Sequence, residues 1–261
     1  MLDKFPLVSV IVTLYNYEKF IHCCIKSILN QDYPNFEIIV IDDASSDKSY
    51  KMAKKYESKN VKVINFKKNR GYSSAKNEGV RLSKGEYIVM LDADDMLTKK
   101  SISTRMNAMM DNDVDFIHAN AIVVRGEISL KNCYRIRNPK LECFSTPYHI
   151  HAQTVLLKKQ IHRDFGLYDE KLRSRSDREM WWRLFGQSEK DKIKVKRFYI
   201  NKSVVYYRYH RRMMTRFRQK NRVYDREIRA LAEEVYQDRK KIGITKENTL
   251  FLEDRKQRTV D

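Results

Sequence analysis

The chain has 261 residues, 42% of them hydrophobic, so it can bury one good core. One domain with an appended tail is therefore expected rather than two equal domains. The longest apolar run, residues 8–14, is far too short to span a bilayer, and the first residues do not resemble a secretory signal. We therefore expect a cytoplasmic protein. The four cysteines follow no metal-ligand spacing, which favours reduced, buried thiols.

Charge is the unusual bulk property, because 53 Lys and Arg residues against 34 Asp and Glu residues leave a net charge of +19. This excess favours an anionic partner. Residues 208–229 contain nine basic and two acidic residues, interleaved with apolar side chains such as Met213 and Phe217. Such a stretch suits an anionic membrane surface, a nucleic acid or a phosphorylated lipid carrier. A solvated tail is an equally acceptable interpretation.

Strands and helices are predicted to alternate through the first half of the chain. Short β-branched runs predict strands at residues 7–14, 36–41, 61–66 and 87–91. Apolar residues at helical spacing predict a helix over 18–30, and helices are also expected over 46–57 and 73–82. This order predicts an α/β fold in which helices cover both faces of a mostly parallel sheet.

Acidic residues follow two of these predicted strands. Asp42 and Asp43 close the second strand, and Asp92, Asp94 and Asp95 follow the fourth. Right-handed crossovers place the ends of parallel strands on one rim, where open α/β sheets bind their ligands. Crowded carboxylates need a cation or protons, and Mg²⁺ or Mn²⁺ prefers oxygen ligands and commonly bridges to phosphate. The alternative is that Asp simply favours turns after strands.

Three segments in order carry a resemblance to a known family. SVIVTLYNYEKFI, IIVIDDASSD and NRGYSSAKNEGVRLSKGEYIVMLDADD closely resemble family 2 of the inverting glycosyltransferases, which have the GT-A fold. The resemblance covers residues 6–210. It implies a GT-A domain over 1–215, with a nucleotide-sugar-binding half (1–98) and an acceptor half (99–215). Residues 216–261 then form a basic helical tail.

The resemblance also implies roles for individual residues on the donor side. Thr13 and Tyr15 resemble residues that line the base pocket, and Asp43, with Asp42 beside it, resembles the acid that contacts the base, which makes uridine the expected nucleotide. The glycine-containing loop that faces the donor supplies Gly71, Lys76 and Asn77. Lys76 stands where the family usually has arginine, so it keeps the charge without the bidentate fork. Asp92 and Ala93 complete the nucleotide-sugar residues. Asp92, Asp94, Asp95 and His210 are the candidate ligands of Mn²⁺ or Mg²⁺.

The second half of the chain supplies candidate acceptor residues. The segment SDREMWW resembles the family's acidic motif before an aromatic helix, and it makes Asp177 the candidate catalytic base. The alternative is a capping box in which Ser176 and Glu179 serve only the start of the helix. The acceptor cleft is expected to involve His151, Glu179, Trp181 and Trp182. A strand is expected from residue 152 to 157.

These residues imply a metal-dependent, inverting transfer of a sugar from a nucleotide-sugar, with UDP favoured, to an acceptor hydroxyl. The acceptor is expected to be a glycan or a lipid-linked sugar in surface-glycan or oligosaccharide synthesis, and the basic tail is compatible with an anionic membrane. A dinucleotide oxidoreductase would need a glycine-rich motif where Leu14 and Tyr15 stand. An aspartate-based phosphatase would need a supporting lysine later in the chain, and this sequence shows no such pattern. A non-catalytic membrane or nucleic-acid module leaves the strand-end acids without a purpose, and nucleic acid is the less favoured partner.

Overall fold

The computed structural model describes residues 5–125, 150–172, 176–185, 195–210 and 259–260. Within these ranges nine strands form one sheet in the order β3-β2-β1-β4-β7-β6-β8-β5, with β9 beside β8. The strands are β1 (Val8–Leu14), β2 (Phe36–Asp42), β3 (Val61–Asn65), β4 (Tyr87–Asp92), β5 (Met96–Leu97), β6 (Phe116–Arg125), β7 (Leu156–Lys158), β8 (Arg197–Tyr209) and β9 (Thr259–Val260). The α-helices are α1 (Ile21–Leu29), α2 (Ser49–Lys54), α3 (Tyr72–Leu82), α4 (Ser101–Asp111), α5 (Gln160–Phe165) and α6 (Ser176–Phe185).

The first four strands form the parallel half of the sheet. β1 lies between β2 and β4 and pairs in parallel with both, and β2 pairs in parallel with β3. All seven residues of β1 are buried, because helices cover both faces of the strand. The predicted elements of this half are confirmed. The first two helices are shorter than expected, since Tyr17, Glu18 and Asp47 serve the loops that precede them.

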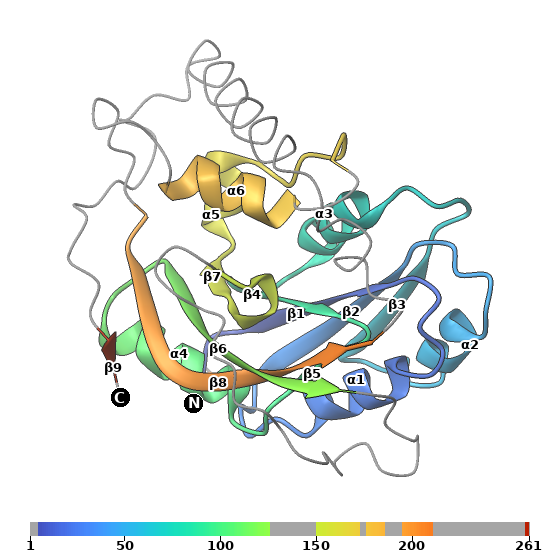
Figure 1. The fold of residues 1–261 in the computed structure, drawn as a ribbon, viewed down its shortest axis with the longest axis horizontal. Helices are drawn as coiled ribbons and strands as arrows, with labels where there is room; N and C mark the ends of the chain where they lie inside the picture. Colours follow the sequence, from blue (N-terminus) through green and yellow to red (C-terminus); the bar gives the residue numbers. More distant parts are fainter. Residues whose placement is uncertain (1–4, 126–149, 173–175, 186–194, 211–258, 261) are drawn as a thin grey trace.

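Helices cover the sheet on two sides, as Figure 1 shows. On one face, α1, α2 and α4 pack against even-numbered residues of β1, so that Val10, Ile25 and Ile102 belong to one apolar cluster. On the other face, α3, α5 and α6 pack over Ile11 of β1, and Trp181 of α6 belongs with Ile11 to a second cluster. The continuous apolar strands of the sequence therefore form the central layer of three.

The second half of the sheet mixes strand directions. β7 pairs antiparallel with both β4 and β6, whereas β6 and β8 are parallel. The strand expected over residues 152–157 is wrong in its first part, because Ala152–Thr154 forms a 3₁₀ helix. The amide and hydroxyl of Thr154 both donate to the His151 carbonyl, at 2.9 and 2.7 Å, and close this turn before β7 begins.

Three further expectations concern the tail and the chemistry of the chain. The predicted tail, residues 216–261, lies outside the described residues except for 259–260, which form β9. Cys24 is a buried free thiol as expected, but Cys23 is disulfide-bonded, which corrects the expectation for that residue. Among the described helices, none has the length and apolar character that a membrane crossing requires.

Candidate active site

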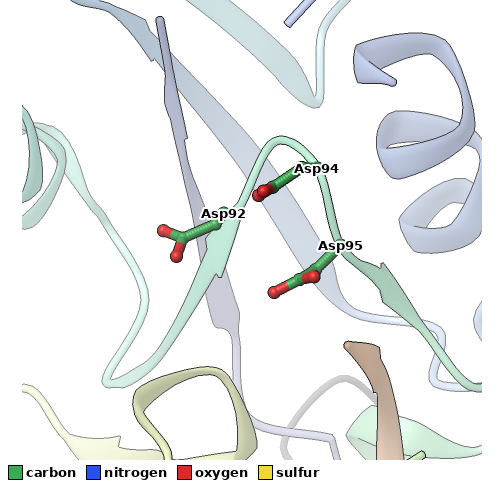
Figure 2. A group of neighbouring side chains, drawn as sticks. All are labelled: Asp92, Asp94 and Asp95. Carbon is green, nitrogen blue, oxygen red and sulfur yellow. The ribbon is translucent and has the colours of Figure 1, made fainter. Parts of the chain in front are cut away.

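The three acidic residues after β4 converge on one side of a tight turn. Asp92 ends β4, opposite Thr13 at the end of β1, and the amide of Asp95 closes the turn by donating to the Asp92 carbonyl at 2.9 Å. Figure 2 shows the carboxylates of Asp92, Asp94 and Asp95 leaving this turn toward the same side. One oxygen from each lies within 4.8 Å of the others. The strand-end acids therefore form one cluster.

Asp92 accepts hydrogen bonds from three side chains. Its Oδ1 accepts hydrogen bonds from the Thr13 hydroxyl at 2.9 Å and the Tyr72 hydroxyl at 2.8 Å, and its Oδ2 accepts one from the Gln153 amide. Burial, reinforced by the charge of Asp94, raises the pKa of Asp92 to about 6. Three donors thus fix the orientation of a carboxylate that binds a proton easily unless a cation lies nearby.

Asp94 and Asp95 are held by the end of β8. The Arg208 amide donates to Asp95 Oδ1 at 2.8 Å, and Arg208 Nε donates to the Asp94 carbonyl at 2.7 Å. His210, the residue after β8, has Nε2 at 2.9 Å from Asp94 Oδ2, and its ring packs on Phe20 at a centroid distance of 5.0 Å. The fold therefore brings His210 to Asp94, which lies 116 residues earlier in the sequence.

The cluster fits a hard divalent cation. Asp95 Oδ2 is buried and has no hydrogen-bond partner among the described residues. Burial, with the charges of Asp94 and Asp92, raises the pKa of Asp95 well above its ordinary value. A cation would remove this repulsion and give the orphaned oxygen a partner. The oxygen-rich donor set, with one imidazole at Asp94, suits Mn²⁺ or Mg²⁺.

Asp43 holds the loop that begins α3. Its Oδ1 accepts a hydrogen bond from the Arg70 amide at 2.6 Å, and its Oδ2 accepts one from the Gly71 amide at 2.9 Å. Gly71 has a φ of 91°, a conformation that favours glycine. Asp42 instead accepts from the Ser45 amide at 3.0 Å, which fixes the turn after β2. The two acids thus have different neighbours, and their predicted contact with a base stays a prediction.

The loop after β1 is held in a defined shape beside this turn. Asn16 and Ala44 both have positive φ, 56° and 59°, which is uncommon for residues with a side chain. Asn16 Oδ1 accepts a hydrogen bond from the Ser46 amide at 2.8 Å, so the loops after β1 and β2 are joined. Tyr15, between β1 and Asn16, is 47% exposed. The predicted base-pocket tyrosine is therefore on an accessible part of a fixed loop.

Lys76 is a buried cation near the acidic cluster. Its Nζ lies 4.0 Å from the centre of the Tyr72 ring and 4.5 Å from that of Tyr168, and it has no hydrogen-bond partner among the described residues. Burial lowers the pKa of Lys76, while the charges of Asp177 and Asp92 raise it. The resemblance implied that Lys76 lies in the glycine-containing loop, which is wrong, because Lys76 lies within α3. There the rings of Tyr72 and Tyr168 cover its ammonium group.

Asp177 lies in the first turn of α6 and is partly buried. Its charge reaches Lys76 and Tyr72, which themselves face Asp92. The capping box considered for this helix start is not formed within the described residues. The Ser176 hydroxyl has no hydrogen-bond partner there, and Glu179 accepts two hydrogen bonds from Arg183. The charge of Asp177 therefore acts on Lys76 and Tyr72, and the described residues do not form the capping pattern that offered the alternative explanation.

The remaining predicted site residues lie in different environments. Glu179 and Trp181 are buried, and Trp181 packs edge-on against Phe116 at 5.0 Å in the apolar core. The ring of His151 lies edge-on against Tyr207, with centroids 4.4 Å apart. The side chain of Trp182 lies outside the described residues. Ala93 is buried, and its amide donates to the Thr13 carbonyl at 3.0 Å, so its backbone continues the pairing of β4 with β1.

Comparison with known proteins identifies the family. The family model described as Glycosyl transferase family 2 matches residues 9–165, which is more than half of the chain. The chain belongs to glycosyltransferase family 2. A relative of this family 2 chain from Methanocaldococcus jannaschii, an uncharacterized glycosyltransferase, is 31% identical over 201 residues, which cover 72% of the chain and 68% of the relative.

Two bacterial relatives match a shorter part of this family 2 chain. An uncharacterized glycosyltransferase of Haemophilus influenzae is 37% identical over 117 residues, covering 44% of the chain and 47% of the relative. The putative teichuronic acid biosynthesis glycosyltransferase TuaG of Bacillus subtilis is 32% identical over 113 residues, covering 42% and 45%. The chain spans about half the length of the curated relatives that it matches first.

Solved structures share the fold of this family 2 chain. TarS residues 1–349 of S. aureus, in complex with UDP-GlcNAc, has a TM-score of 0.69 at 20% identity and covers 87% of this chain and 66% of its own. The mannosyltransferase PcManGT from Pyrobaculum calidifontis, in complex with GDP-Man and Mn²⁺, has a TM-score of 0.52 at 22% identity, covering 67% and 51%. Both likenesses support a GT-A-like arrangement, a mixed and mostly parallel sheet flanked by helices.

Several residues of this family 2 site were not predicted from the sequence. Tyr72, Gln153 and Arg208 contact the acidic cluster, and Tyr17 lies beside Asp94, whose charge adds to burial in raising the tyrosine's pKa. Position was the only signal available for Tyr72, which directly follows Gly71, and for Arg208, which lies two residues before His210. Gln153 stood in a segment expected to be a strand, so nothing local pointed to it.

Proposed function

We propose that this chain is a metal-dependent, inverting glycosyltransferase that moves a sugar from a nucleotide-sugar to an acceptor hydroxyl. One observation carries the proposal: the three acids at the end of β4 lie together with His210, and the charges of both Asp92 and Asp177 act on the buried Lys76. Acids of this kind at the carboxyl ends of parallel strands suit a diphosphate with its cation. Membership of family 2 supplies the reaction class.

The donor is proposed to be a UDP-sugar. TarS, which shares the fold, was solved with UDP and with UDP-GlcNAc, whereas PcManGT was solved with GDP-Man. The base and ribose would lie over the joined loops after β1 and β2, between Thr13, Tyr15 and Asp43. Ala93 and the Gly71 loop would lie along the donor, and Asp42 would support this pocket through its turn. A hexosyl or N-acetylhexosaminyl group is the proposed cargo.

Asp94, Asp95 and His210 would hold the cation, with Asp92 as the neighbouring carboxylate. When bound, the ion supplies positive charge that stabilises the negative charge developing on the departing diphosphate. Lys76 adds a second positive charge from within the protein, and Tyr72 and Tyr168 keep that ammonium away from bulk water. A buried cation acts more strongly on a developing charge than an exposed one would.

Asp177 is the proposed general base. It accepts the proton of the acceptor hydroxyl while that oxygen bonds to the anomeric carbon from the face opposite the diphosphate. The bond from the anomeric carbon to the phosphate oxygen breaks, and the diphosphate leaves with the electron pair. Attack from the opposite face inverts the anomeric configuration in a single displacement. Glu179, paired with Arg183, fixes the helix that presents Asp177.

The acceptor is proposed to be a glycan or lipid-linked sugar of a cell-surface pathway. The name of one relative, TuaG, refers to teichuronic acid synthesis, which supports this setting without specifying the acceptor. His151, at the turn before β7, and Trp182 on α6 are proposed to lie on the acceptor side of the site, and Trp181, which packs against Phe116 in the core, would support α6 from behind. The basic residues beyond His210 are proposed to favour an anionic membrane surface at the cytoplasmic face.

The decisive experiment compares Asp177→Asn with Asp94→Ala. We expect Asp177→Asn to keep UDP and Mn²⁺ affinity but to lose about 10²- to 10⁴-fold in transfer rate, since an amide cannot accept the hydroxyl proton. Asp94→Ala should instead lose Mn²⁺-dependent UDP binding. UDP release with a panel of UDP-, GDP- and dTDP-sugars, together with calorimetric titration of UDP, measures both. An Asp177→Asn variant within a few-fold of wild-type activity would remove Asp177 as the base.

A further inference from the structure

Helix α3 is fastened to the segment that leads into α6 by the side chain of Asn77. This amide is buried; its Oδ1 accepts a hydrogen bond from the Tyr168 amide and its Nδ2 donates to the Tyr168 carbonyl, both at 2.9 Å. Nδ2 also donates to Glu170 Oε1 at 2.9 Å. One side chain therefore satisfies both backbone groups of Tyr168 and uses its oxygen and both N–H donors in doing so.

Glu170 extends this connection along α3. Its second oxygen, Oε2, accepts a hydrogen bond from the Ser74 hydroxyl at 2.8 Å, and Arg81 lies 3.6 Å away as an ion-pair partner. The Ser73 hydroxyl donates to the Leu172 carbonyl at 3.0 Å, next to the same segment. Three turns of one helix thus contact residues 168–172. Hydrogen bonds with Asn77 and Ser74 lower the pKa of Glu170, so it is a charged acceptor at neutral pH.

The same segment is held from its other side by α6. Arg183, on α6, donates to the carbonyls of Phe165 and Leu167, the latter at 3.0 Å, while its guanidinium is paired with Glu179. The backbone from residue 165 to 172 is therefore hydrogen-bonded both to α3 and to α6, the helix that carries Asp177. At the start of α3, Gly71 is bonded to Asp43 and Tyr72 to Asp92, so the helix is also fixed to the donor side.

We propose that Asn77 and Glu170 are positioning residues that fix the first turn of α6, and with it Asp177, relative to the donor-side carboxylates. This inference rests on the proposed function, and it gives Asn77 a role behind the site instead of a contact with the donor. The hydrogen bonds between Asn77 and Tyr168 also place the tyrosine ring over Lys76. Asn77 and Glu170, which we call the clamp, therefore also set the surroundings of the buried Lys76. Misplacing a reacting group by about 1 Å can cost about 10²-fold in rate.

The test uses Glu170→Ala, which removes the acceptor oxygens from a partly exposed side chain, and Glu170→Gln, which keeps one of them. The matched control is Glu78→Ala, because Glu78 also faces Arg81, at 3.5 Å, but contacts nothing in residues 168–172 in the hydrogen bonds described. We expect Glu170→Ala to lower turnover about tenfold while UDP affinity changes less than about twofold. Glu170→Gln and Glu78→Ala should both stay within about threefold of wild type.

Amide hydrogen exchange gives a second measurement that does not depend on activity. In Glu170→Ala, exchange across residues 168–172 and the first turn of α6 should accelerate, and in Glu78→Ala it should not. Unchanged exchange in Glu170→Ala, full transfer by that variant, or a parallel loss of UDP affinity and turnover would each overturn the positioning role. A wild-type protein that transfers no sugar would refute the proposed function instead, and exchange would still show whether the clamp exists.

Discussion

Lys76 Nζ and Asp95 Oδ2 belong to ionisable side chains and are buried without a hydrogen-bond partner among the described residues. An uncompensated buried charge is destabilising by several kcal/mol, so a folded protein rarely keeps one without use. The two side chains ionise with opposite signs, and the charge of Asp92 acts on both. In the proposed function, a diphosphate with a divalent ion would offer an anion for Lys76 and a cation for Asp95.

His162 gives a prediction at the residue scale that is independent of the site. Burial lowers the pKa of His162 from 6.5 to about 3. Between these values the unfolded chain binds a proton that the folded protein does not, so His162 stabilises the fold above pH 6.5 and this contribution falls as the pH falls. The slope should be about 1.4 kcal/mol per pH unit. His162→Phe should therefore lose less stability than wild type between pH 6.5 and 4.5.

Urea unfolding of both proteins at several pH values within that window measures the difference. The comparison of slopes is needed because other groups titrate in the same range. Burial also lowers the pKa of His118, to about 4, with the same sign, while the raised pKa of Asp92 acts in the opposite direction. Both groups are common to the two proteins, so their effects cancel. Parallel slopes would show that His162 is not kept neutral by the fold.

At the scale of elements, α3 depends on close contact with the central strand. A Cβ built on Gly79 would lie 2.2 Å from Ile11 Cγ2, and Ile11 is fully buried in β1. Since this helix starts at the Asp43-bound loop and carries Lys76, its distance from the sheet sets the positions of that loop and of Lys76. The glycine is therefore required by packing, although alanine is the better helix former.

Gly79→Ala should destabilise the protein by about 1–3 kcal/mol, because overpacking outweighs the gain in helix propensity of about 1 kcal/mol. Thermal unfolding monitored by circular dichroism checks this, with Glu78→Ala as the neighbouring control on the same helix. The loss should shrink when Gly79→Ala is combined with Ile11→Ala, since the clashing methyl is then absent. A Gly79→Ala protein as stable as wild type would mean that α3 can move away from β1 freely.

For the whole molecule, ligand and ion should stabilise the fold only together. UDP bound with Mn²⁺ at one hundred times its dissociation constant should add about 2.7 kcal/mol, which raises the Tm by roughly 5–10 °C for a domain of this size. UDP in the presence of a chelator should give a much smaller shift. Differential scanning fluorimetry of wild type and Asp94→Ala measures both, and the variant should lose the metal-dependent part. Equal shifts with and without Mn²⁺ would argue against the proposed cation site.

The sequence by itself determined the parallel half of this protein. Continuous apolar strands such as residues 8–14, with amphipathic helices between them, leave few alternatives to a covered parallel sheet, and that topology puts Asp43 and Asp92 on one rim. These are local patterns with short-range physical causes. The DADD segment, residues 92–95, also predicted a cation site from a local pattern, because its carboxylates crowd at the end of one strand.

Only the tertiary structure decided which residues complete the site. His210 reaches Asp94 because β8 runs beside β5, and Gln153 reaches Asp92 because residues 152–154 turn into a 3₁₀ helix instead of extending β7. Asn77 and Glu170 form a hydrogen bond although they are 93 residues apart along the chain. Such pairings depend on long-range packing of several elements at once, so no local period or motif encodes them. Lys76 is likewise buried because the fold brings the ring of Tyr168, which is distant in the sequence, over its ammonium group.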